Sequence, residues 1–256
     1  MLITSIQLEF KEKTKENTLA YVLQLLDQAK GSDLVLLPEI WPIGYFSFSR
    51  YAKESETIKG PIVQAMRKKA ADLKAHLLMG SFVEQDGGKL FNTSLLIDPR
   101  GKILARFRKI HLFGYQSQER KLLSPGKKIT VVDSPWGKIG LSTCYDLRFP
   151  ELFRKMVDQG AEIFLVTSAW PYARLAAWTL FNRARAHENL AFLISCNAAG
   201  VNAGCKLAGH SMIVNPLGEI VAQGGEKEEI VTAEIDPKMV QSVRKDFSAL
   251  RDRVFK

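Results

Sequence analysis

The chain has 256 residues, of which 46% are apolar and 25% charged, proportions typical of a globular protein. This apolar content excludes a disordered tail, and 18 Gly and 10 Pro residues without a period exclude a collagen-like repeat. Three cysteines are too few for a disulfide framework, and their odd number favours a reducing compartment.

The charge balance is basic, because 36 Lys and Arg residues against 27 Asp and Glu give a formal net charge of +9. The basic residues are spread along the chain without a zinc-finger spacing or an RNA-binding aromatic motif, so we expect no nucleic-acid partner. The first ten residues have no charged leader, and no apolar run approaches the ~20 residues of a membrane span. We therefore expect a cytoplasmic protein without a membrane partner.

Short apolar runs alternate with amphipathic segments in the first half of the chain. Strands are predicted at Leu2–Leu8, Leu34–Leu37, His76–Glu84, Asn92–Asp98 and Ile103–Arg108, and helices at Lys15–Lys30 and Pro61–Ala75. Gly31 stops the first helix, and Pro61 begins the second, where a missing N–H costs least. The sequence Asp-Gly-Gly-Lys at 86–89 predicts a hairpin.

The same alternation continues in the second half. Strands are predicted at Thr130–Asp133, Lys138–Thr143, Glu162–Thr167, Leu190–Cys196, Ser211–Asn215 and Ile230–Ile235, and helices at Phe149–Gln159, Leu175–Asn189 and Pro237–Phe247. The runs 35–37 and 163–166 are apolar on both faces, which is typical of strands buried on both sides. With no linker or repeat, the pattern predicts one layered α/β domain over residues 1–256.

Three polar residues stand where a plain core would not place them. Glu39, Lys109 and Cys144 each lie within two residues of the end of a predicted strand. In open α/β sheets, sites gather at the carboxyl ends of strands. A carboxylate that takes the proton of a thiol, beside an ammonium that stabilises the thiolate and an oxyanion, makes a covalent catalyst. The backbone N–H of Tyr145 is a second candidate donor to the oxyanion.

Each of these residues also has an ordinary structural explanation. A lone cysteine such as Cys144 is most often a small buried hydrophobe. A lone glutamate such as Glu39 can begin a helix, and a lone lysine such as Lys109 is most often solvated. The three residues by themselves leave this choice open.

Three segments resemble the signature segments of the nitrilase superfamily of carbon–nitrogen hydrolases: LLPEI at 36–40, RKIHLF at 108–113 and STCYDLRFPE at 142–151. Their order and spacing also agree, with 70 residues from Glu39 to Lys109 and 35 from Lys109 to Cys144. Two further segments extend the resemblance over nearly the whole chain, RARAHEN at 183–189 and GHSMIVNPLG at 209–218. The resemblance implies a four-layer α-β-β-α sandwich.

The resemblance implies a Glu–Lys–Cys triad, with Cys144 as the nucleophile, Glu39 as the general base and Lys109 as the electrostatic stabiliser. Glu119 matches a second glutamate of the family, which positions the lysine and hydrogen-bonds the leaving amine or the incoming water. The alternative for Glu119 is a surface carboxylate paired with a neighbouring basic residue.

The implied reaction has two halves and needs no metal or other cofactor. The thiolate of Cys144 attacks an amide carbonyl, ammonia leaves, and a thioester remains. A water activated by Glu39 then releases the acid. Cys196 and Cys205 lack metal-ligand spacing with Cys144 and lie in apolar or Gly-rich surroundings, which indicates structural roles.

The residues after the nucleophile favour one branch of the superfamily. Tyr145 and Asp146 stand where true nitrilases tend to have Trp-Glu, so the segment resembles the amidases that include omega-amidases and Nit proteins. Their substrates are small amides with a remote carboxylate, such as keto analogues of glutamine and asparagine. Arg148 is a candidate for binding that carboxylate, and its alternative is an ion pair with Asp146 or Glu151.

Four further residues are candidates for the substrate pocket. Ala169 and Trp170 belong to the segment SAWP at 168–171, which matches a family loop lining the pocket. Tyr145 lies next to the nucleophile, and Tyr45 follows a Pro-Ile-Gly turn. The alternative for Trp170 is an ordinary core residue.

Two other functions fit parts of the same pattern. An N-carbamoyl amide hydrolase needs the same triad and differs in its pocket residues. A catalytically idle subunit that binds a partner is disfavoured, because the triad is intact. The resemblance also implies a homodimer or a larger even oligomer, with the helix that contains 183–189 at the interface.

Overall fold

The computed structural model describes residues 1–255, and its centre is a pair of six-stranded mixed sheets within that range. The first sheet consists, in spatial order, of β15 (Glu229–Glu234), β1 (Leu2–Gln7), β3 (Leu34–Leu36), β4 (His76–Asp86), β5 (Lys89–Ile97) and β6 (Ile103–Arg108). The second consists of β14 (Ile220–Gln223), β13 (Met212–Val214), β10 (Phe192–Asn197), β9 (Ala161–Ser168), β8 (Gly137–Thr143) and β7 (Val131–Ser134).

Both sheets have a parallel centre and antiparallel margins. In the first, β1, β3 and β4 run parallel, and in the second β8, β9 and β10 do so. The antiparallel steps from β4 to β5 and from β5 to β6 return β6 to the direction of β3. The carboxyl ends of β3 and β6 therefore lie at the same edge of the first sheet.

The two sheets pack face to face through one apolar layer. Ile3, Leu34 and Leu78 of the first sheet belong to the same core cluster as Ile163 and Phe192 of the second, and each is 1% exposed or less. Burial on both faces explains why these strands are continuously apolar in sequence.

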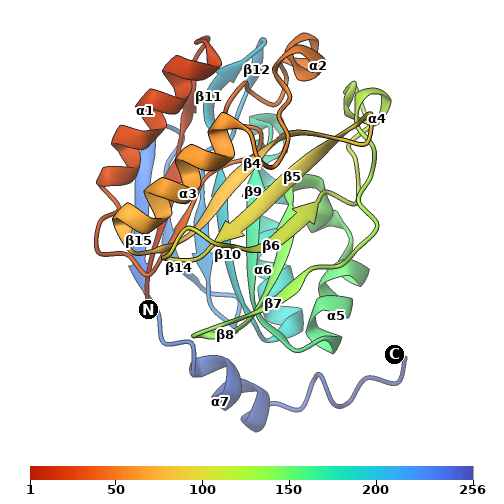
Figure 1. Ribbon diagram of the computed structural model, residues 1–256. Helices are drawn as coiled ribbons and strands as arrows, with labels where there is room; N and C mark the ends of the chain where they lie inside the picture. The colour runs from red at the N-terminus through yellow and green to blue at the C-terminus, as the bar shows by residue number, and fades with distance from the viewer. Residues whose placement is uncertain (256) are drawn as a thin grey trace.

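Helices cover the outer faces of both sheets, as Figure 1 shows. The pair α1 (Lys15–Asp27) and α3 (Pro61–Leu73) packs on the first sheet. The pair α5 (Pro150–Asp158) and α6 (Leu175–Asn189) packs on the second. This arrangement confirms the predicted four-layer α-β-β-α sandwich. Pro61 begins α3, as its position in the sequence predicts.

The remaining elements are short. They are β2 (Glu9–Phe10), β11 (Ala199–Asn202) and β12 (Cys205–Lys206), the helices α2 (Tyr51–Glu54), α4 (Glu119–Leu122) and α7 (Met239–Asp246), and the 3-10 helices η1 (Phe48–Arg50), η2 (Cys144–Arg148) and η3 (Tyr172–Arg174). Of these, only α7 was predicted from sequence, because the others are too short to show a hydrophobic period. In Figure 1, α7 lies at the lower end of the sandwich.

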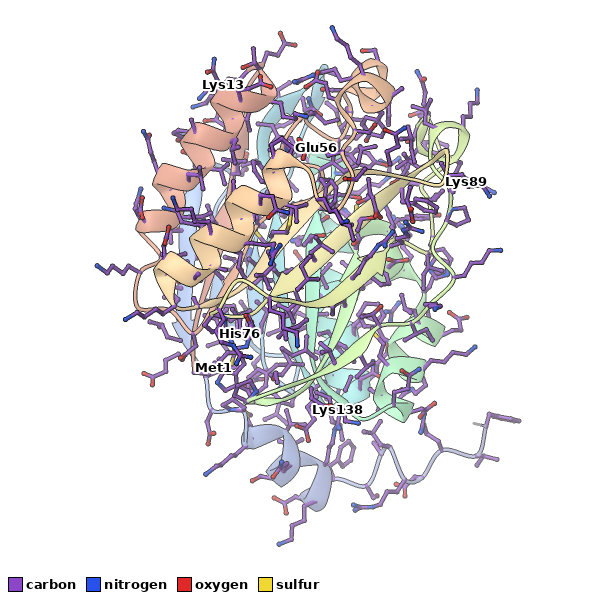
Figure 2. The ribbon with its side chains drawn as sticks, viewed as in Figure 1. Met1, Lys13, Glu56, His76, Lys89 and Lys138 are labelled. Carbon is purple, nitrogen blue, oxygen red and sulfur yellow. The ribbon has the colours of Figure 1, made fainter. Side chains whose placement is uncertain are left out.

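The basic charge is distributed over the outside of the molecule. Lys13, Lys89 and Lys138 are exposed and lie on three different margins of the ribbon in Figure 2. This distribution agrees with a solvated surface rather than a single basic tract. Among residues 1–255, no helix is long and apolar enough to cross a membrane.

Candidate active site

Four strand ends bring the predicted catalytic residues to one edge of the sandwich. Glu39 lies three residues beyond β3, while Lys109 and Cys144 directly follow β6 and β8. Ala169 directly follows β9. Glu39 and Lys109 have no solvent exposure, and Cys144 is only 6% exposed. All three side chains thus lie at or close to strand ends, as the sequence predicts.

Lys109 is the centre of a buried ion-pair cluster. Its Nζ atom lies 2.8 Å from Oε1 of Glu39, and 3.0 and 3.1 Å from the two carboxylate oxygens of Glu119. Glu119, at the start of α4, is completely buried, so the alternative of a surface carboxylate is wrong. The hydroxyl of Tyr45 and the backbone N–H of Phe113 also donate to Glu119, at 3.1 and 2.6 Å.

Asn92 joins the two carboxylates and was not predicted as a site residue. Its Nδ2 atom donates to Oε1 of Glu39 at 2.8 Å and to Oε1 of Glu119 at 3.2 Å. It lies on β5 with 1% exposure. It begins the predicted strand Asn92–Asp98, and the polar residues Thr93 and Ser94 follow it, so the sequence pattern did not single it out.

The second carboxylate oxygen of Glu39 is also fixed. Its Oε2 atom accepts from the backbone N–H of Ala169 at 3.0 Å. The backbone N–H of Glu39 donates to the carbonyl of Ser168 at 3.2 Å, which ties the loop after β3 to the end of β9. The next residue, Ile40, has a φ of 43°, and its N–H donates to Oγ of Ser81 at 2.9 Å. The carboxylate is thus held from both sheets.

Cys144 has a strained backbone that is stabilised locally. Its φ of 48° lies in the left-handed region that a side chain disfavours. One oxygen of Asp146 accepts from the N–H of Thr143 at 3.1 Å, and the other from the N–H of His111 at 2.9 Å. The His111 ring nitrogen Nδ1 lies 2.7 Å from the same Asp146 oxygen. Asp146 therefore links the turn of the nucleophile to the segment after Lys109.

Arg148 does not form the ion pair that was its alternative explanation. Asp146 is occupied by His111 and the backbone, and the described residues give Arg148 no carboxylate partner. Its guanidinium carbon lies 5.1–5.8 Å from three aromatic ring centroids, those of Phe181, Trp170 and Tyr145. The charge is therefore held by aromatic faces and is free to bind an anion.

Burial and charge act in opposite directions on the two ion-pair partners. Burial raises the pKa of Glu39, the charge of Lys109 lowers it, and the charge of Glu119 raises it. The net result is a pKa above that of an ordinary glutamate. Burial alone would lower the pKa of Lys109, but Glu119 and Glu39 together hold it well above its usual value. Lys109 is thus a permanent cation, and Glu39 is a base of increased proton affinity.

The thiol of Cys144 is protonated in the resting site. Burial is the main reason that its pKa is raised, and the negative charge of Glu39 adds to the effect. The charge of Lys109 and the polarity of the Ser168 hydroxyl oppose it. A base must therefore take the thiol proton as the sulfur attacks.

A pocket opens in front of Cys144, and we call it the nucleophile pocket. It is lined by Tyr45, Phe46, Phe113, Cys144, Tyr145, Arg148, Ala169, Trp170, Pro171 and Arg174. The five residues predicted to bind substrate are all among them. Trp170 is 2% exposed, and its ring centroid lies 5.6 Å from that of Trp178. It is therefore both a core residue and a wall of the pocket.

Sequence reasoning missed Phe46, Phe113 and Arg174 as lining residues. Arg174 lies in η3, and its guanidinium carbon is 5.3 Å from the ring centroid of Phe113. None of the three lies in an element with a hydrophobic period, so the sequence did not indicate that they line the pocket.

The other two cysteines lie apart from the ion-pair cluster. Cys196 is completely buried on β10, with its Sγ atom 3.1 Å from the carbonyl of Ile6. Cys205 is half-buried on β12. In residues 1–255, no group of three or more His, Cys, Asp or Glu side chains is arranged to hold a metal ion.

A buried thiol, an ammonium and two carboxylates on a four-layer sandwich define a cysteine-dependent hydrolase of carbon–nitrogen bonds. The sequence matches the model of the carbon-nitrogen hydrolase family over residues 2–245, and the chain belongs to this family. The match confirms the family that the three signature segments indicated.

Individual relatives agree with this assignment. The chain is 34% identical to the 2-oxoglutaramate amidase of Paenarthrobacter nicotinovorans, over 98% of this chain and 88% of that protein. It is 33% identical to Saccharomyces cerevisiae Nit3, a member of the nitrilase superfamily, with a TM-score of 0.91 over 100% of this chain and 97% of that one. A variant of an amidase from Nesterenkonia, 25% identical with a TM-score of 0.86 over 96% and 97%, carries a Michael adduct of acrylamide at its active-site cysteine.

Proposed function

We propose that the chain hydrolyses the omega-amide of a small dicarboxylate, such as a 2-oxo acid amide, to the acid and ammonia. The observation that carries this proposal is the guanidinium of Arg148, which lines the nucleophile pocket with Cys144 and has no carboxylate partner among the described residues. The similarity to a 2-oxoglutaramate amidase supports the same substrate class.

In the first half of the proposed reaction, Cys144 attacks the amide carbonyl carbon. Glu39 takes the thiol proton as the carbon–sulfur bond forms, which its raised proton affinity favours. The oxyanion of the tetrahedral intermediate is stabilised by the ammonium of Lys109 and the backbone N–H of Tyr145. Glu39 returns the proton to the leaving nitrogen, the carbon–nitrogen bond breaks, and ammonia and a thioester remain.

In the second half, water replaces ammonia. Glu39 takes a proton from the water, whose oxygen attacks the thioester carbon through a second tetrahedral intermediate. The carbon–sulfur bond then breaks, the sulfur is reprotonated, and the carboxylic acid leaves. Glu119 holds Lys109 in place through both halves, and its contacts with Tyr45 and Phe113 fix it in turn.

The pocket suits a small anion with an uncharged amide. Arg148 and Arg174 supply two positive charges, and neither has a carboxylate partner in residues 1–255. Tyr45, Trp170 and Phe113 supply apolar walls for the short carbon chain between the two ends of the substrate. A guanidinium binds a carboxylate through two parallel hydrogen bonds, which orients the amide toward the sulfur.

The test is ammonia release from a panel of omega-amides, neutral aliphatic amides, N-carbamoyl amino acids and nitriles. We expect turnover of the omega-amides and none after Cys144→Ala. An acyl adduct on Cys144, trapped by rapid acid quench and located by mass spectrometry, identifies the nucleophile. Preferred turnover of the carbamoyl compounds selects the runner-up reaction, and full activity of Cys144→Ala contradicts both.

We also propose a homodimer. Four exposed apolar side chains lie on α6 and on the neighbouring β13–β14 hairpin: Leu180, Leu217, Ile220 and Val221. The hairpin is fixed to the helix, because Nε of Arg183 donates to the carbonyl of Gly218 at 2.9 Å. A second copy of this chain that covers these side chains removes them from water.

A further inference from the structure

The hydroxyl of Ser168 is buried and forms no hydrogen bond within the described residues. The residue has no solvent exposure, and its Oγ atom has no hydrogen-bond partner in residues 1–255. A buried polar group without a partner destabilises the folded chain, so such a group needs an explanation. Its backbone is fully engaged, since its carbonyl accepts from the N–H groups of Glu39 and Ala198 at 3.2 and 3.0 Å.

The position of Ser168 in the sheet places it beside the nucleophile. Strands β8 and β9 pair in parallel, and their last registered pair is Thr143 with Thr167. Cys144, the first residue of η2, and Ser168, the last residue of β9, directly follow this pair in sequence. The carbonyl of Ser168 also accepts from the backbone N–H of Glu39, so Ser168 adjoins the loop that carries the base.

We propose that Ser168 is a further catalytic residue, whose hydroxyl donates a hydrogen bond to the sulfur of Cys144 as the thiolate forms. The proposal rests on the proposed role of Cys144 as nucleophile. The thiol proton passes to Glu39, and Ser168 keeps its own proton throughout. The hydroxyl, unpaired beside a neutral thiol, gains a strong charge-assisted bond when the sulfur becomes negative.

The electrostatics of the site agree with this role. Burial and the charge of Glu39 raise the pKa of Cys144, while Lys109 and the Ser168 hydroxyl lower it. Lys109 is already paired with Glu39 and Glu119, so much of its charge is compensated. A second donor at the sulfur therefore has a large effect on how easily the thiolate forms.

The test measures the sulfur directly rather than turnover. Purified wild type and Ser168→Ala are labelled with acrylamide from pH 6 to 10, and peptide mass spectrometry follows the adduct on Cys144. We expect Ser168→Ala to react about tenfold more slowly at neutral pH, with the rate rising at a higher pH than in wild type. We expect an unchanged or higher melting temperature, because the removed hydroxyl has no partner to lose.

Ser5→Ala is the matched control. The Ser5 hydroxyl is also completely buried without a partner in the described residues, but it lies within β1, away from the strand ends. We expect this variant to label at the wild-type rate.

The outcomes separate the two proposals. A wild-type rate and pH profile in Ser168→Ala overturns the role of Ser168, as does an equal slowing in Ser5→Ala. A wild type that neither labels Cys144 nor releases ammonia overturns the proposed function instead. If Ser168→Ala is less stable than expected, the labelling rate of the folded fraction still decides.

Discussion

Lys109 and Glu39, 70 residues apart in sequence, form an ion pair of 2.8 Å between Nζ and Oε1 in which neither side chain is exposed. Removing two charges from water is costly, and an apolar pair of the same size is often as stable. The pair is therefore weak support for a purely structural role. Its position between a thiol and a second carboxylate agrees with a chemical one.

The first prediction concerns the stability of this cluster. Lys109→Met leaves Glu39 and Glu119 buried without their cation, so we expect the free energy of unfolding at pH 7 to fall by about 3–5 kcal/mol. Urea denaturation measures the change. Lys89→Met, at an exposed position, is the control and should leave the midpoint unchanged. An equal, small effect of both substitutions would show that Glu39 and Glu119 do not depend on Lys109.

The second prediction concerns the pH dependence of activity. Because burial raises the pKa of Glu39, the base is lost by protonation at a higher pH than for an ordinary glutamate with a value of 4.5. The acid limb of kcat/KM should therefore lie above that value. Asn92→Asp places a further negative charge 2.8 Å from Glu39, which raises its pKa more and moves the limb to higher pH.

The control for Asn92→Asp has the same change in net charge at an exposed position. Asn17→Asp on α1 meets this condition, and we expect its pH profile to match the wild type. An acid limb that stays in place in Asn92→Asp, or moves to lower pH, contradicts the assignment of Glu39 as the base.

Much of the fold could be predicted from the sequence, because its elements have strong local signals. The helix Leu175–Asn189 and the strand Ile103–Arg108 have the predicted bounds, and other elements differ by a few residues. Strand ends also predicted where Glu39, Lys109 and Cys144 lie. Their direct contact could not be predicted, since it depends on how two sheets stack.

The residues that sequence reasoning missed have positions set by tertiary contacts. Asn92 looks like an ordinary strand residue until β5 is paired with β4 and β6. Arg174 lies in η3, a single turn without a hydrophobic period. The ion pair predicted as the alternative for Arg148 relied on its sequence neighbours Asp146 (i−2) and Glu151 (i+3). It is wrong because Asp146 instead binds His111 and Thr143, and Glu151 forms no ion pair with Arg148 among the described residues.

The third prediction tests the anion site. Arg148→Gln removes the charge but keeps a polar side chain of similar length, so we expect KM for an omega-amide with a carboxylate to rise at least tenfold. We expect kcat/KM for a neutral aliphatic amide of equal length to change less than threefold. Initial rates on the two substrates provide the comparison. An equal loss of kcat/KM on both substrates would show that Arg148 shapes the pocket and does not bind the carboxylate.

The fourth prediction tests the proposed homodimer. Leu180 on α6 is 62% exposed, and Leu180→Glu places a charge where the second copy would pack. Light scattering at micromolar concentration should give the mass of a dimer for wild type and of a monomer for the variant. Leu122→Glu, which also replaces an exposed leucine, should remain a dimer. A monomeric wild type would refute the proposal.

The fifth prediction concerns the loop that carries Tyr45 into the site. Gly44 has a φ of 85°, and a Cβ atom there would lie 2.6 Å from Nδ2 of Asn202. Asn202 fixes this loop, since its Oδ1 atom accepts from the N–H of Phe46 at 2.6 Å and its Nδ2 donates to Oγ of Ser47 at 3.0 Å. Gly44→Ala therefore adds a backbone strain and a clash at the same time.

We expect Gly44→Ala to lower the free energy of unfolding by about 2–3 kcal/mol and to raise KM, because Tyr45 and Phe46 shift on the pocket wall. Gly88→Ala is the matched control, because Gly88 has a φ of 74° and no atom lies within 4 Å of the added Cβ. We expect this variant to lose about 1 kcal/mol of unfolding free energy through backbone strain alone. In an Asn202→Ala background the clash is already gone, and Gly44→Ala should cost no more than the control. Thermal or urea unfolding of these variants measures the difference, and additive losses in the double variant would show that Gly44 and Asn202 do not act through one another.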